Sequence, residues 1–142
     1  MVAKLMVFMS LKRSTTVPRQ LAIAYAIIVV AVSSYPGLQL PEIGHTPLDK
    51  FAHCAQYAIL GFLVCWGWGP WRPGGTAGTK AWIPMLILLI FAGADEYHQH
   101  WIPGRVPEWL DWTADATGII AGYLLGAWNN RRILRRVSNE TG

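Results

Sequence analysis

Charged side chains are scarce in this chain. Only 14% of its 142 residues are charged, while 53% are hydrophobic, and soluble domains carry about 25% charged residues. So few charges cannot cover a water-facing surface, which excludes an ordinary soluble domain. Together with a mean hydropathy of +0.29, the composition predicts a small integral membrane protein with a single domain over residues 1–142.

Cysteine is also rare. Cys54 and Cys65 lie eleven residues apart in one expected helix, which corresponds to ~16 Å between their Cα atoms at ~1.5 Å per residue. That separation is too large for an intramolecular disulfide. We therefore interpret both thiols as small apolar side chains.

A basic stripe with interleaved aromatic side chains, the usual footprint of nucleic-acid binding, is absent as well. The net charge is +4 and the pI is near 9.3. The basic residues, however, flank the ends of apolar segments, as the positive-inside rule expects. We therefore expect membrane lipids, and no nucleic acid, as partners.

What the sequence does contain is four apolar segments. We expect helices at about residues 17–35, 48–68, 81–98 and 109–128. The predicted fold is all-α, a small polytopic membrane four-helix bundle. The first segment has a second interpretation, because a basic flank, an apolar stretch and Ala31-Val32-Ser33 are also features of a signal peptide. If the first helix is retained, the bundle has an even number of helices, and we adopt this interpretation.

The charges divide between the two ends of this bundle. Ten of the twelve Lys and Arg residues fall on one side, and only Lys50 and Arg105 on the other. The positive-inside rule then places both termini in the cytoplasm and the chain in the cytoplasmic (inner) membrane of a bacterium. All four histidines and seven of the eight carboxylates fall on the outer side. We therefore predict an outward-facing polar site.

The second segment carries the first part of this site. Asp49, His53 and Tyr57 recur every four residues and share one helix face, beside Lys50. A lone membrane histidine is often only a packing hydrogen bond to a neighbouring helix. Three polar residues in register next to a lysine favour function, because ionisable groups at membrane depth are costly.

The third segment ends in GADEYHQH, which places two carboxylates and two histidines within six residues. Such a group can supply acid–base pairs or oxygen and nitrogen ligands for a metal. The spacing is not that of a standard zinc motif, so a divalent cation stays open and we assign no cofactor. The alternative is a solvated helix end.

Arg105 follows the Pro103-Gly104 turn signal. Its guanidinium could bind a phosphate or carboxylate bidentately. The alternative is an internal salt bridge to Glu96, Asp95 or Asp111 that holds the loop.

The fourth segment carries a row of small residues below two aspartates. Gly118, Gly122 and Gly126 repeat every four residues and continue the face of Asp111 and Asp115. Such rows let another helix approach closely. Both aspartates should therefore point into the bundle, where they need partners; Arg105, Lys50 and His53 are the candidates.

These motifs resemble the VanZ-like membrane protein family. DKFAHCAQYAILG resembles the family signature D-K-x-x-H-x-x-x-Y-x-x-L-G, and the likeness extends over roughly Asp49 to Gly126. The family's E-x-x-Q, Pro-Gly-Arg and D-x-x-x-N-x-x-G elements are matched in order by Glu96, Gln99, Arg105, Asp111 and Gly118. Asp115 stands where the family often has asparagine. The family's namesake is associated with resistance to the glycopeptide antibiotic teicoplanin, which implies a role at the cell envelope.

Two functions follow as hypotheses. The first is a membrane-embedded enzyme acting on a lipid-linked envelope precursor or an anionic headgroup. The second is a non-catalytic lipid- or antibiotic-binding or assembly protein whose polar cluster is structural; a transporter is less favoured for four short helices without repeat symmetry. Candidate catalytic residues are Asp49, His53, Glu96, Asp111 and Asp115. Candidate substrate-binding residues are Lys50, Tyr57, Gln99 and Arg105. We expect these side chains to converge in one pocket, with Arg105 touching a carboxylate.

Overall fold

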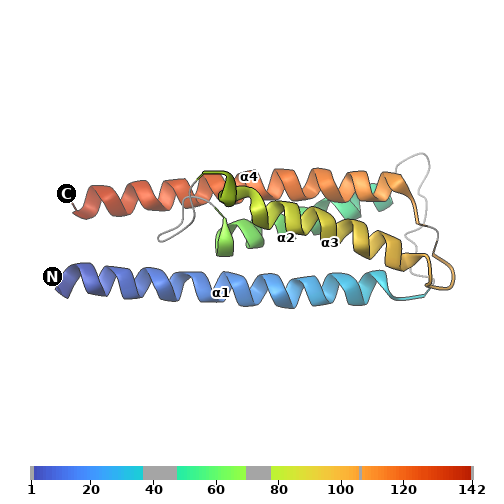
Figure 1. Cartoon of the computed structure of the whole chain (residues 1–142), viewed down its shortest axis with the longest axis horizontal. Coiled ribbons are helices and arrows are strands. Elements are labelled where there is room, and N and C mark those ends of the chain that lie inside the picture. Colours follow the sequence, from blue (N-terminus) through green and yellow to red (C-terminus); the bar gives the residue numbers. More distant parts are fainter. Residues whose placement is uncertain (1, 37–47, 70–77, 106, 142) are drawn as a thin grey trace.

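A computed structural model describes residues 2–36, 48–69, 78–105 and 107–141. Over these residues the chain is all-helical, with helices α1 (Val2–Ser33), α2 (Leu48–Trp68), α3 (Ile83–Gln99) and α4 (Trp109–Thr141). A short 3-10 helix, η1 (Gly78–Trp82), precedes α3. Helices α1 and α4 run the length of the molecule, and the two ends of the chain lie at the same end of it (Figure 1).

Helices α1 and α4 are longer than the apolar segments that predicted them. Helix α1 begins at Val2 instead of near residue 17, and α4 continues to Thr141 instead of ending near residue 128. Hydropathy marks the residues that avoid water, not the point at which a helix ends. Residues 129–141 contain no glycine or proline that would end α4.

Pro18 lies inside α1 and is fully buried. A proline removes one backbone hydrogen bond from a helix, and packing of the neighbouring helix can compensate for the loss. Such packing is present beside it, because Arg19 Nε donates to the carbonyl of Gly67 in α2 at 2.9 Å. A side chain at Gly67 would collide with Arg19, since a Cβ there would lie 2.9 Å from Arg19 Cγ.

The most extensive contact between helices joins α2 and α4. At Gly118 an added Cβ would overlap the carbonyl oxygen of Cys54, and at Gly122 it would overlap that of Ala58. At Gly126 it would lie 2.7 Å from the Cβ of Cys65. The glycine row is therefore a packing surface, as predicted, and it turns the face that carries both aspartates towards α2.

The core contains side chains from all four helices. Its buried members are Val29, Tyr57, Leu60, Leu88, Ala92 and Ile119. A second cluster, nearer the C-terminal end of α2, consists of Cys65, Tyr123 and Ala127. There the Tyr123 hydroxyl donates to the carbonyl of Ala81 at 2.6 Å, which ties η1 to α4.

The sides of the molecule are apolar. Ile27, Ile59, Ile90 and Leu125, one from each helix, are between 50% and 64% exposed. Soluble monomers rarely expose large contiguous apolar patches. Two helical segments, Thr16–Ser33 and Leu48–Trp68, are long and apolar enough to cross a membrane. The outer surface of the helices therefore suits apolar surroundings.

Candidate polar site

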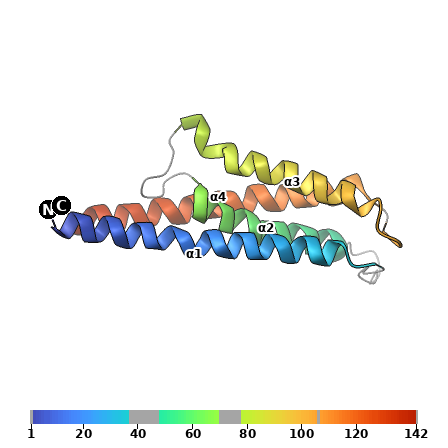
Figure 2. The same cartoon turned by 60° about the horizontal axis from the view of Figure 1, so that its bottom comes forward.

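Polar side chains gather at the end of the molecule opposite the two termini, where α1 and α3 end and α2 and α4 begin (Figures 1 and 2). The buried polar residues at this end are Ser33, Asp95, Glu96, Gln99, Asp111 and Asp115. Together with Asp49, Lys50, His53, Tyr57 and Glu108, they form what we call the polar cluster. Burying so many polar groups requires partners for each of them.

His53 is held between two aspartates. Its Nδ1 lies 3.0 Å from Oδ1 of Asp115, whose side chain is only 2% exposed. An ionised carboxylate can only accept, so Nδ1 donates the hydrogen, and in the neutral ring Nε2 carries the lone pair. That Nε2 lies 3.9 Å from Oδ1 of Asp49, whose side chain is 42% exposed. His53 therefore faces into the bundle, with its basic nitrogen on the accessible side.

Lys50 is the counter-ion of three carboxylates. Its Nζ donates to Glu108 Oε2 at 2.7 Å, to Asp111 Oδ1 and, more weakly, to Asp49 Oδ2 at 3.4 Å. The Asp111 side chain is 9% exposed, so the ammonium compensates a carboxylate that is nearly removed from water. Two of the partners predicted for the two aspartates of α4 are therefore observed: Lys50 pairs with Asp111, and His53 pairs with Asp115.

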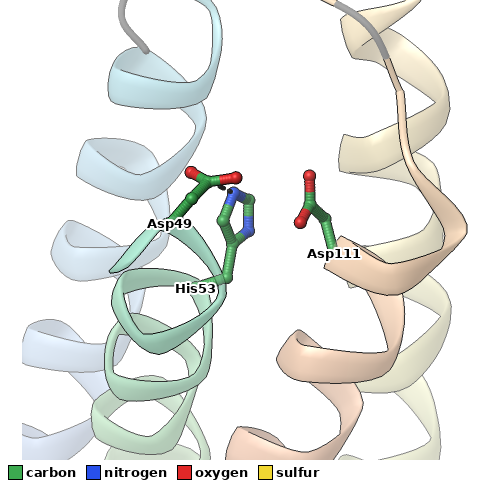
Figure 3. A group of neighbouring side chains, drawn as sticks. All are labelled: Asp49, His53 and Asp111. Carbon is green, nitrogen blue, oxygen red and sulfur yellow. Dashed lines mark ion pairs between the residues drawn. The ribbon is translucent and has the colours of Figure 1, made fainter. Parts of the chain in front are cut away.

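Asp49, His53 and Asp111 form the group best suited to a metal ion among the residues described. Each offers one ligand atom, and the three atoms lie within 4.8 Å of one another. Figure 3 shows Asp49 and His53 on α2 facing Asp111 across the gap to α4. The donor set suits a divalent ion, but Lys50 Nζ already contacts both aspartates. Lys50 therefore already supplies a positive charge to both aspartates.

Asp95 joins three helices. Its Oδ1 accepts from the Ser33 hydroxyl of α1 at 2.7 Å, and its Oδ2 accepts from the Tyr57 hydroxyl of α2 at 3.0 Å. Tyr57 was predicted to bind substrate, but its hydroxyl is bonded to Asp95 and its side chain is buried inside the cluster. Ser33 had not been predicted, because a single serine at the end of an apolar helix carries no signal of its own.

Glu96 and Gln99 fix the start of α4. Gln99 Nε2 donates to Glu96 Oε2 at 3.2 Å, and the backbone N–H of Glu108 donates to Glu96 Oε1 at 2.7 Å. Both α3 side chains are buried. Glu108 itself was not a predicted site residue, yet both its backbone and its carboxylate enter the cluster.

Arg105 forms no ion pair with Glu96, Asp111 or Asp115, which are all among the described residues, so the prediction that it would contact one of them was wrong. Its Nη2 donates to the carbonyl of Val32 at 3.3 Å. The reason is the turn before it, in which Gly104 has φ of 78° and Arg105 N donates to Ile102 O at 3.1 Å. This turn directs the chain towards the end of α1. Arg105 Nε is buried there and has no hydrogen-bond partner within the part of the chain that the structure describes.

The VanZ/LLP1 family matches the chain over residues 1–130. The chain belongs to the VanZ/LLP1 family. No curated protein and no solved structure matches it. The family assignment confirms the resemblance found in the motifs.

In this VanZ/LLP1 chain, the polar motif residues of α2, α3 and α4 meet in the polar cluster, and Arg105 lies at its edge. Asp115, which stands where the family often has asparagine, is the residue that holds His53. The two exposed histidines of the α3 end, His98 and His100, lie against the Trp101 ring instead. Glu42 and His45 fall outside the described residues.

Proposed function

We propose that this VanZ/LLP1 protein crosses the bacterial cytoplasmic membrane four times, with both termini in the cytoplasm and the polar cluster at the outer face. Two helical segments are apolar enough to span, and all four helices expose large apolar side chains. Six described carboxylates belong to the polar cluster, at the ends of the helices opposite the termini. The described basic residues outside the polar cluster and its edge lie in the helices that lead to the termini or in η1, which agrees with the positive-inside rule.

The polar cluster would perform acid–base chemistry on a lipid-linked or anionic substrate of the cell envelope. One observation carries this proposal, namely the Asp115–His53 pair with Nε2 beside a partly exposed Asp49. A buried carboxylate that fixes one ring nitrogen orients the histidine and stabilises its cation. The other nitrogen is then available to take a proton from a water or hydroxyl nucleophile.

The remaining residues would have supporting roles. Arg105 is the candidate for binding an anionic group, because it is the cation at this end without a described carboxylate partner. Lys50, also predicted to bind substrate, is engaged by Glu108 and Asp111. It would instead offset part of the negative charge of the cluster.

A non-catalytic structural cluster is the second candidate function. The observation in its favour is that each of the six carboxylates described in the cluster has an internal partner. The six are Asp49, Asp95, Glu96, Glu108, Asp111 and Asp115. A polar core satisfied in this way can hold helices together and specify their arrangement without any chemistry.

Replacing His53 by glutamine separates the two candidates. Purified protein would be incubated in vesicles made from bacterial lipid extract, and the lipids would be compared by mass spectrometry before and after. An enzyme should change at least one lipid, and His53→Gln should slow that change about 10²–10⁴-fold while the protein remains folded. No lipid change with the wild-type chain, together with a loss of thermal stability in His53→Gln, would favour the structural cluster.

A further inference from the structure

An apolar groove lies between α1, α2 and α3, nearer the termini than the polar cluster. Its volume is about 310 Å³, and its lining includes Ala22, Ala26, Leu60, Val64, Ile87 and Phe91. Two residues on its rim, Ile23 and Ile87, are 56% and 61% exposed. The groove therefore opens sideways on the surface that faces lipid in the proposed topology.

Beyond the end of the groove that is nearer the polar cluster, a hydrogen bond joins α1 and α3. Ser33 of α1 donates to Asp95 of α3 at 2.7 Å and joins the two helices at the level of the polar cluster. Away from this bond, α3 diverges from α1 (Figure 2). An apolar molecule can therefore enter from the side between the helices.

Arg105 lies nearer the outer end of α1 than the groove does. Its Nη2 bonds the carbonyl of Val32, six residues after Ala26 on α1, a distance of ~9 Å along the helix axis. The Nε of the same guanidinium is buried and has no hydrogen-bond partner among the described residues. Leaving a buried N–H unpaired is costly, and an anion beside the guanidinium would satisfy it with a charge-assisted hydrogen bond.

We infer that the groove holds one acyl chain of an anionic bilayer phospholipid whose phosphate binds Arg105. The inference rests on the proposed four-span topology, because only then does the groove face lipid. Because the groove is apolar and opens sideways, the group that enters it should be an acyl chain from the bilayer. The Arg105 guanidinium, about one to two helical turns beyond the groove on α1, would favour a lipid with a negatively charged head.

Native mass spectrometry of the full chain in detergent tests this inference. The probes are long-chain phosphatidylglycerol, dihexanoyl phosphatidylglycerol and long-chain diacylglycerol. The first should bind at least tenfold more tightly than the other two, because only it offers both the phosphate and the chain. Arg105→Gln should weaken its binding about tenfold or more. Lys80→Gln, an exposed cation in η1, should leave it unchanged.

The groove itself is tested by filling it. Ala26→Leu should weaken phosphatidylglycerol binding about tenfold, whereas Ala24→Leu, on the exposed face of α1, should not. If Ala26→Leu unfolds the chain, Ile87→Ala serves instead, with Ile90→Ala as its control. Both isoleucines are similarly exposed, at 61% and 64%, but only Ile87 lines the groove. The first should weaken binding several-fold and the second should not.

Three results would overturn the inference. They are equal binding of all three probes, equal effects of the groove variants and their controls, and tighter binding of a polyprenyl phosphate than of phosphatidylglycerol. These experiments distinguish a failure of the lipid-binding inference from a failure of the proposed enzyme activity. Phosphatidylglycerol that binds the wild-type chain as expected, with no lipid converted by that chain, would support the groove and contradict the enzyme.

Discussion

Replacing Gly122 by alanine should lower the free energy of unfolding of the bundle. A Cβ at this position would overlap the backbone carbonyl oxygen of Ala58 in α2. A backbone oxygen within a helix cannot rotate away as a side chain can. The two helices would have to separate along a contact that also depends on Gly118 and Gly126, each of which approaches α2 in the same way.

The magnitude follows from two opposing terms. Alanine is the better helix former and gains about 1 kcal/mol over glycine. Overpacking a tight contact costs about 1–3 kcal/mol, occasionally more, and overlap with a backbone atom belongs at the upper end of that range. We therefore expect Gly122→Ala to lose about 1–2 kcal/mol net. The matched control is Gly93→Ala in α3, where the nearest atom to a new Cβ is Trp112 Nε1 at 3.3 Å.

The assay is unfolding in mixed micelles with increasing sodium dodecyl sulfate, followed by circular dichroism. Gly93→Ala should be neutral or slightly stabilising, since the Trp112 ring is a side chain that can shift. Gly122→Ala should unfold at a lower fraction of denaturing detergent. Equal stability of the two variants would refute the close contact between α2 and α4.

Two further predictions concern single interactions. Lys50→Met should lower the free energy of unfolding by about 1–3 kcal/mol, between the values for exposed and buried ion pairs, because it leaves the buried carboxylate of Asp111 without its counter-ion. Added salt should not restore the lost stability, and a stability equal to that of the wild type would mean that the ion pair is not formed. Tyr123→Phe removes the donor to the carbonyl of Ala81 and should cost about 1 kcal/mol by the same assay, while the exposed Tyr97→Phe should cost nothing measurable.

The sequence predicted those features that follow from helix periodicity. The four-residue spacing of Asp111, Asp115 and the glycines places them on one face, and that face does pack on α2. Lys50 and His53 were among the partners expected for the two aspartates, and they are the ones observed. Regular helices convert spacing into direction, so these contacts need no tertiary information.

Contacts made by helix ends and turns could not be predicted in this way. The conformation at Gly104 directs Arg105 to the carbonyl of Val32 and not to a carboxylate. A Pro-Gly pair indicates that a turn occurs, but not which of several neighbours the next side chain reaches. Ser33 enters the cluster only because α1 ends beside Asp95, which depends on how the helices are packed.

The central claim, that the polar cluster faces the outside of the cell, is tested most directly by thiol labelling in intact cells. In a chain with Cys54 replaced by alanine, leaving the buried Cys65, a cysteine would be introduced at Asp49 or at Lys80. We predict that a membrane-impermeant reagent labels Asp49→Cys in intact cells and Lys80→Cys only after the membrane is made permeable. Labelling of Lys80→Cys in intact cells, with Asp49→Cys protected, would contradict the account.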